Sequence, residues 1–310
     1  MLKYVLKRIV MIIPVVLAVS FIVFFIMDFV PSDPAVTVLG HGATEQQIEY
    51  YRETHGLNDP LPVRYVRYMA GIAKGDLGTS YAQNRPVWDI FFEKFPNTFK
   101  LAIASVIVTV LLSIPLGILA AVKNNTWIDT ICSTLSFVGL AMPNFWLGLL
   151  LIILFSVNLH WLPSTGAVGF KSLILPAITC GTGNMAALTR ITRSSMLEVI
   201  RQDYIRTAKA KGAMRWAVIL KHALKNAMIP IVTLVGTDFG YMLTGSMLIE
   251  KVFSIPGIGK LAVDAMSNRD LPLLEGTVMY IAFVFVVVNL IVDVSYAFLD
   301  PRIRYGKGAA

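Results

Sequence analysis

The chain has 310 residues, of which 56% are hydrophobic and only 15% are charged. Soluble domains carry about 25% charged residues, so this composition predicts that much of the surface faces lipid. The formal net charge is +8, but the basic residues lie between apolar runs. This arrangement argues against a folded basic surface for nucleic acid and favours a role in membrane orientation.

Six apolar runs are long enough to cross a bilayer. A helix needs about 20 apolar residues to span about 30 Å of hydrocarbon. The runs are residues 9–30, 99–122, 131–157, 172–189, 227–249 and 277–299. The first is too long for the apolar part of a signal peptide, and no small-residue cleavage site follows it. We therefore predict an all-α integral membrane protein with six transmembrane helices, beginning with a retained helix within residues 1–30.

The fourth run is the most polar, and several of the runs contain proline. Residues 179–184 include two threonines, two glycines and an asparagine, so we expect other helices to shield this span from lipid. Membrane helices tolerate an internal proline when neighbouring groups satisfy the freed carbonyl. We expect bent helices at Pro115, Pro143, Pro176 and Pro230.

The lysines and arginines between the runs predict the orientation. If the N-terminus is inside, the inner segments hold 16 of the 27 basic residues and the outer segments hold 10, with Lys100 at the edge of a span. Short cytoplasmic loops carry the excess of positive charge in membrane proteins. We therefore predict that both termini are cytoplasmic, that residues 31–98 form an extracytoplasmic insert, and that 301–310 form a cytoplasmic tail.

Two long hydrophilic segments lie between the runs. The outer insert is predicted to contain short helices over 45–54 and 88–95 and to cap the membrane core, with or without a partner protein. The inner loop 190–226 carries nine basic residues and two acidic ones. It is typical of a short helix that ends at Gly212, followed by a second helix that enters the membrane at Pro230. Such a loop could bind a partner protein or contact anionic lipid headgroups, and the residues alone do not decide between these two hypotheses.

The sequence carries no motif for catalysis or nucleotide binding. Residues 257–260, Gly-Ile-Gly-Lys, lack the upstream glycine and the following Ser or Thr of a phosphate-binding loop. No metalloprotease or nucleophile-elbow motif occurs, and Cys132 and Cys180 have no metal-site or disulfide spacing. We therefore predict no enzyme activity, no metal site and no cofactor in this chain. Energy for transport would come from an ion gradient or from a separate subunit.

The inner loop resembles the loop of bacterial ABC-importer permeases that docks into a groove on the ATPase subunit. The stretch reads D-Y-I-R-T-A-K-A-K-G at 203–212 and H-A-L-K-N-A-M-I-P at 222–230. The variant found in the dipeptide, oligopeptide and nickel subfamily matches it almost throughout. The general importer pattern is only partly kept: Ala208, Gly212 and Leu224 match it, and Arg206, Thr207, His222 and Lys225 depart from it.

Further similarity to the B-type permeases of this subfamily extends over nearly the whole chain. Residues 31–35, P-S-D-P-A, resemble the segment after the family's first span, with Ser32 in place of glycine. The other matching segments are 75–80, 85–87, 253–259, 269–272 and 300–305. Agreement at so many separate places identifies the chain as similar to this family.

The resemblance implies the type I ABC-importer permease fold, with the insert between the first two helices and a permease core over 99–300. It also implies a machine with several partners in the bacterial inner membrane. A second homologous permease would complete the path, two ATPase domains would hydrolyse ATP with Mg, and an extracytoplasmic binding protein would deliver the substrate.

The resemblance also implies roles for individual residues. The ATPase-docking coupling loop would be Asp203, Tyr204, Arg206, Thr207, Ala208, Lys209, Ala210, Lys211 and Gly212, with Gly212 permitting close backbone approach. Asp76 and Arg85 in the insert would contact the binding protein. Asp238, Asn144 and Asn184 are candidates for the translocation path. The carboxylate of Asp238 would either favour substrates with a positive group or bond a neighbouring helix.

Two other classes of protein are weaker interpretations. A gradient-driven secondary transporter would usually show inverted repeats with broken helices in matching positions, and we find no convincing repeat. A membrane-embedded enzyme would place a nucleophile and base, or metal ligands, at membrane depth, and no such cluster is evident. For the substrate, a peptide is the first prediction and nickel or a metal chelate is the alternative.

Overall fold

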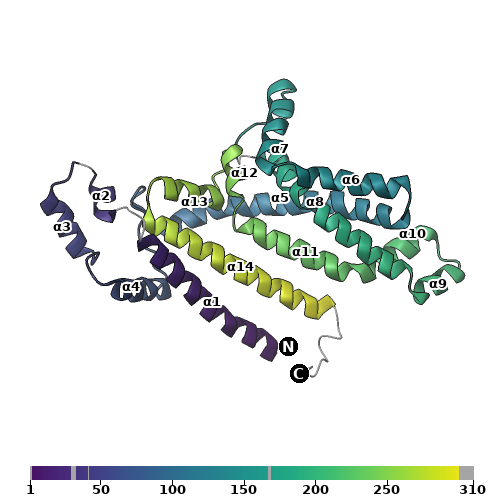
Figure 1. Cartoon of the computed structure of the whole chain (residues 1–310), viewed down its shortest axis with the longest axis horizontal. Helices are drawn as coiled ribbons and strands as arrows, with labels where there is room; N and C mark the ends of the chain where they lie inside the picture. Colours follow the sequence, from purple (N-terminus) through teal and green to yellow (C-terminus); the bar gives the residue numbers. More distant parts are fainter. Residues whose placement is uncertain (1, 29–32, 41, 167–168, 300–310) are drawn as a thin grey trace.

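The computed structural model describes residues 2–28, 33–40, 42–166 and 169–299, and within these ranges the chain is built from helices (Figure 1). Five long helices form the body of the bundle: α1 (Leu2–Asp28), α5 (Val87–Val122), α8 (Lys171–Ile200), α11 (Lys225–Leu243) and α14 (Leu271–Leu299). The small helices α2 (Pro34–Leu39), α3 (Glu45–Thr54) and α4 (Leu61–Ala73) lie at one end of the molecule, and α9 (Asp203–Ala210) lies at the other (Figure 1).

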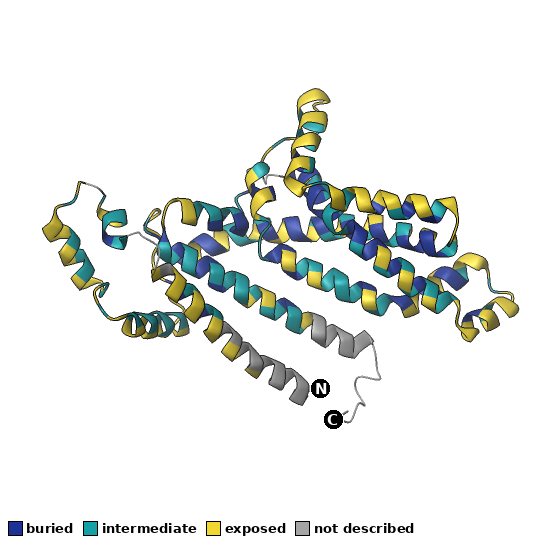
Figure 2. Cartoon of the chain, viewed as in Figure 1, coloured by how far each residue is buried: buried dark blue, intermediate teal, exposed yellow. Residues whose placement is uncertain are grey.

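Helices α5 and α8 pack closely along their length because small residues bring their backbones together. A Cβ atom added to Gly117 would lie 2.5 Å from the Thr192 side chain. The hydroxyl of Thr109 donates to the Gly181 carbonyl at 3.0 Å, which joins the same two helices. Small interfacial residues and interhelical hydrogen bonds are the usual means of helix association in a membrane. The buried residues of Figure 2 follow this contact.

Three described helical segments are long and apolar enough to cross a membrane: Val87–Val122, Arg215–Leu243 and Leu271–Ile291. The second of these combines α10 (Arg215–Ala217), the π-helix η2 (Val218–Leu224) and α11. Within α1, the described residues contain a shorter apolar helical segment, Leu17–Ile26. The long helix α8 is more polar, as expected from residues 179–184.

The predicted third span is broken. Helix α6 (Trp127–Ala141) and the pair formed by α7 (Asn144–Leu151) and the π-helix η1 (Ile152–Asn158) meet at a bend of 96°. Met142 at the break is extended, with φ −96° and ψ 130°. The residue before a proline is disfavoured in the helical region, so Pro143 explains why the helix stops there. Helix α7 consequently points away from the bundle (Figure 1).

Several predicted boundaries are wrong by about two to three turns of helix. Helix α8 continues to Ile200, so the first part of the predicted inner loop is helical. Helix α11 ends at Leu243 rather than near residue 249. The chain turns at Gly245, whose φ is +96° and whose added Cβ would lie 2.5 Å from the Gly259 amide nitrogen. A separate helix, α12 (Met247–Val252), then follows.

The insert contains one helix that was predicted correctly and one that was not. Helix α3 spans Glu45–Thr54 and begins with a capping box between Thr44 and Gln47. The separate helix predicted over 88–95 is the first part of α5, which runs on through Pro96. Buried side chains of this part of α5 pack against α13 (Ile258–Ser267) and the start of α14; they are Val87, Ile90 and Phe91. That packing favours a continuous helix.

Candidate functional site

Helix α9 stands out from the bundle and is fixed to it by one buried side chain. Ile205 is 1% exposed and joins a hydrophobic cluster with residues of α5, α8 and η2. The buried members that it joins include Ile118, Leu188, Met196 and Ile219. A displacement of α9 would therefore be passed directly to the ends of α5 and α8, because packed interiors have few voids and transmit strain.

The rest of α9 and the residues that follow it form an exposed surface. Of the nine predicted docking residues, Ala208 is half-buried and the other eight are exposed (Figure 2). Arg206 lies 3.8 Å from Asp203, but both side chains are largely in solvent, so the pair contributes little stability. This surface carries basic side chains and several small residues, and a partner protein could reach them.

Gly212 ends this surface in a left-handed conformation. Its φ is +78°, and nothing lies within 4 Å of a Cβ added there. The Gly212 amide donates to the Lys209 carbonyl at 3.0 Å, which completes the helix end. Within this chain, glycine is therefore explained by backbone conformation rather than by crowding. The open space beside it leaves room for another backbone to approach.

An ion pair that sequence reasoning missed lies behind α9. Arg193 of α8 binds Asp129 of α6 through two hydrogen bonds of 2.7 Å each, and it also donates to Asn124 at 2.8 Å. Asp129 is 7% exposed. A two-pronged guanidinium–carboxylate contact fixes orientation as well as distance. The pair therefore ties α6 to the part of α8 that adjoins α9.

The three predicted path residues are only partly brought together. Asn144, at the exposed start of α7, packs against α8, since a Cβ added to Gly183 would lie 2.7 Å from its Oδ1. Asn184 is the next residue of α8 and is half-buried. Asp238 lies on α11, and no hydrogen bond joins it to either asparagine within the described residues. Its Oδ2 is buried there without a hydrogen-bond partner.

The two predicted contacts for a binding protein lie in the insert, on or beside the loop before α5. Both Asp76 and Arg85 are exposed. Asp76 accepts a hydrogen bond of 2.8 Å from the Gly78 amide, and Arg85 donates to Glu93 at 3.0 Å. Each side chain is therefore held locally while remaining open to solvent.

Two buried carboxylates hold this end of the molecule together, and sequence reasoning missed both. Glu250 is fully buried and accepts from the Thr98 hydroxyl and the Lys260 amide, each at 2.8 Å. Asp270 is also fully buried and accepts from the Ser80 hydroxyl at 2.5 Å. These bonds attach α12 to α5 and the loop of the insert to the start of α14. The sequence did offer a signal for these two residues. Glu250 directly follows the apolar run 227–249, and Asp270 directly precedes helix α14.

Comparison with known sequence families decides what kind of protein this is. Residues 113–305 match the binding-protein-dependent transport system inner membrane component. Residues 1–102 match the N-terminal region of the binding-protein-dependent transport system membrane component. The chain belongs to this family. It is a multi-pass inner-membrane protein and the permease subunit of an ABC importer of the dipeptide and oligopeptide type.

Individual relatives match this permease over almost its whole length. The glutathione transport system permease protein GsiC of Salmonella paratyphi A is 44% identical over 305 residues, covering 98% of this chain and 100% of the relative. The GsiC protein of Escherichia coli K12 is 42% identical with the same coverage. A chain of the inward-facing MetNI methionine ABC transporter has a TM-score of 0.59 at 15% identity, covering 68% of this permease and 96% of that chain. This last likeness confirms the fold predicted from sequence.

Proposed function

We propose that this permease and a second homologous permease form the path for a peptide, which an extracytoplasmic binding protein delivers. Two separate ATPase domains supply the energy by hydrolysing ATP with Mg. The observation that carries this proposal is the exposed helix α9, which is mounted on the bundle through the buried Ile205, with the half-buried Ala208 beside it. It offers a partner a surface that is coupled to α5 and α8.

The orientation in the proposal places α9 in the cytoplasm and the insert outside. The excess of basic residues around α9 supports it. The beginning of α1 and the end of α14 lie away from the insert, on the side of α9, which agrees with termini that share the cytoplasmic side (Figure 1). In this orientation Asp76 and Arg85 face the binding protein.

A peptide is the substrate that the relatives favour. The matching proteins that are 42–44% identical are named as glutathione permeases, and glutathione is a tripeptide. A nickel ion or metal chelate remains the alternative cargo of the same machine. Either substrate would arrive bound to the binding protein, which would set most of the specificity.

The substrate that the binding protein carries tests the proposal. We expect mass spectrometry of the purified binding protein to detect a bound peptide. Proteoliposomes that contain the whole importer should take up that peptide only when ATP is supplied inside. A nickel complex in place of the peptide would favour the alternative. Uptake driven by an ion gradient without ATP would contradict the proposal.

A further inference from the structure

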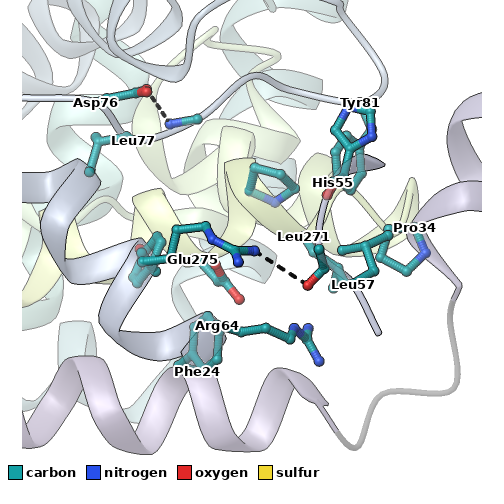
Figure 3. A pocket seen from close by; sticks show the side chains of 16 residues that line it. Phe24, Pro34, His55, Leu57, Arg64, Asp76, Leu77, Tyr81, Leu271 and Glu275 are labelled. Atoms are coloured by element: carbon teal, nitrogen blue, oxygen red, sulfur yellow. Dashed lines mark hydrogen bonds between the residues drawn. The ribbon is translucent and has the colours of Figure 1, made fainter. Parts of the chain in front are cut away.

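A cavity lies between the insert and the membrane helices, at the end of the molecule opposite α9. Its volume is about 260 Å³, and it is lined by parts of α1, α4, the loop before α5 and the start of α14 (Figure 3). The residues that matter for its chemistry are Phe24, His55, Arg64, Tyr68, Tyr81 and Glu275. Three of the family segments quoted above contribute to its lining, at Pro34, at residues 76–78 and at residues 271–272. The resemblance assigns none of them a bound small molecule.

The two arginines that line the cavity are already neutralised. Arg64 donates to Asp28 at 2.6 Å, and Arg67 donates to Asp59 at 2.5 Å. Each guanidinium thus has a carboxylate beside it. The cavity therefore has no unpaired cation among its described lining residues that would attract an anion.

The remaining carboxylates leave the cavity negative. Asp76 accepts a hydrogen bond from the Gly78 amide at 2.8 Å. Glu275 projects from α14 among the cavity side chains (Figure 3), and no described group gives it a hydrogen bond. Asp76 and Glu275 line the cavity, and Asp28 and Asp59 neutralise its two arginines, so two negative charges are left over. Glu275 is attracted by the charge of Arg64, but that guanidinium is already paired with Asp28. A partly buried carboxylate without a hydrogen bond is costly, so a cation in the cavity would be stabilised.

The walls of the cavity suit an organic cation. Tyr68, Tyr81 and His55 contribute aromatic rings, and cations are attracted to the faces of such rings. The ring of Phe24 already carries a cation, since the Arg64 guanidinium lies 5.8 Å from its centroid. The Tyr68 hydroxyl is buried and has no hydrogen-bond partner in the described part of the chain. No group of three or more His, Cys, Asp or Glu residues positioned for a metal ion occurs among the described residues. A metal site is therefore a poorer fit than an ammonium group.

We propose that this cavity binds a primary ammonium group, with Glu275 as its counter-ion and the aromatic rings as its walls. The volume admits a small organic group rather than a whole peptide. Two sources carry this chemistry: the amino terminus or lysine side chain of a transported peptide, and the ethanolamine headgroup of a phospholipid beside α1. The first source rests on the proposed function, and the second does not.

Binding of propylammonium to the assembled importer tests the proposal without measuring transport. The importer is placed in nanodiscs of phosphatidylglycerol, whose headgroup has no amine, and titrated by calorimetry. We expect saturable binding of propylammonium and none of the neutral 1-propanol. Glu275→Gln should weaken binding by about tenfold or more, as expected for the loss of a desolvated charge pair.

Two further variants separate the site from general effects on folding. Leu57→Trp fills the cavity and keeps the Glu275 carboxylate, so it should also abolish binding. Glu53→Gln removes an exposed carboxylate of α3 and should leave binding unchanged. Equal affinity in the original chain and in Glu275→Gln, or equal binding of propylammonium and 1-propanol, would overturn the proposal. If Glu275→Gln fails to fold, Leu57→Trp decides.

A second nanodisc composition distinguishes the sources. If the lipid headgroup is the natural ligand, adding phosphatidylethanolamine should compete with propylammonium. If a peptide amine is the ligand, the lipid should have no effect, and a dipeptide with a free amino terminus should compete where its acetylated form does not. Peptide uptake is scored separately, so failure of the site leaves the proposed function intact.

Discussion

Asp238 places a carboxylate within a helix that is long and apolar enough to cross the membrane. A charged residue at the bilayer centre costs about 2.5–3.5 kcal/mol on insertion scales. Such residues usually face a bundle interior or a water-filled cavity. The buried Oδ2 has no hydrogen-bond partner among the described residues, which favours the path over a bond to a neighbouring helix.

We expect Asp238→Asn to slow ATP-driven uptake of the native substrate by about tenfold, corresponding to about 1.4 kcal/mol, if that substrate carries a positive group. The asparagine keeps the size of the side chain and removes its charge. Uptake of a neutral substrate analogue by the same variant is the control and should change little. An unchanged rate for the cationic substrate would assign Asp238 a structural role instead.

The ion pair of Asp129 and Arg193 should contribute to stability. We expect Arg193→Met to lower the free energy of unfolding by about 1.5–3 kcal/mol, because it removes charged hydrogen bonds from a buried carboxylate. In detergent, thermal unfolding should show this as a Tm lower by about 5 °C.

A matched control is the exposed Arg206, whose contact with Asp203 is 3.8 Å. Arg206→Met should leave the Tm unchanged. If the two substitutions lowered the Tm equally, the buried ion pair of Arg193 would contribute no more to stability than the exposed pair of Arg206.

Single residues were predictable only where the local sequence marks them. Asp238 was found because it is a charge inside an apolar run. Arg193 and Asp129 were missed because their partnership joins positions 64 residues apart. Glu250 was missed for the same reason, since its partner Thr98 is 152 residues away. Pairings of this kind depend on how the helices pack.

At the scale of an element, α9 has few buried contacts with the bundle and is followed by a glycine in the left-handed conformation. A residue other than glycine at the φ of Gly212 costs about 1–2 kcal/mol. Three substitutions at this position separate strain from bulk. Alanine adds strain and little volume, asparagine tolerates the left-handed conformation, and tryptophan adds bulk on the exposed side.

We expect Gly212→Trp to insert normally and hydrolyse ATP in the assembled importer while losing uptake of substrate. Gly212→Ala and Gly212→Asn should retain coupled uptake. The ratio of ATP hydrolysed to substrate transported, measured in proteoliposomes, checks this. Coupled uptake at the normal ratio in Gly212→Trp would remove α9 from the transmission of energy. Ala208 is less suitable because it packs partly against the chain's own hydrophobic cluster.

Elements were predicted well where composition and local turn chemistry agree. Helix α3 and the end of α9 near Gly212 were predicted. The structure shows a local signal at both places, a capping box at Thr44 and a left-handed glycine. Six apolar runs were predicted to span the membrane. Three described helical segments are long and apolar enough to do so, and the bent pair of α6 with α7 and η1 is a fourth candidate. The 96° bend was less predictable, because a proline in a membrane helix can be accommodated or can break it, depending on neighbours. Boundaries such as the end of α8 depend on packing against α9 and η2.

At the scale of the whole molecule, the fold separates the two surfaces to which the proposed function assigns partner proteins. Helix α9 lies at one end, and the small helices of the insert lie at the other (Figure 1). The cavity is at the insert end. The long helices α5 and α8 connect the two ends through a continuous packed contact. In an importer of this kind, ATPase movement at α9 would reach the outer end through these two helices.

The central claim is that α9 is the surface on which the ATPase docks. The most direct test places the photo-crosslinking residue p-benzoylphenylalanine at Tyr204, which is 44% exposed on α9, and irradiates cells that express the whole importer. Incorporation at Glu45 on α3, at the opposite end, is the control. We predict an adduct with the ATPase from position 204 and none from position 45. Adducts with lipid but not with the ATPase at position 204, or an ATPase adduct at position 45, would contradict the account.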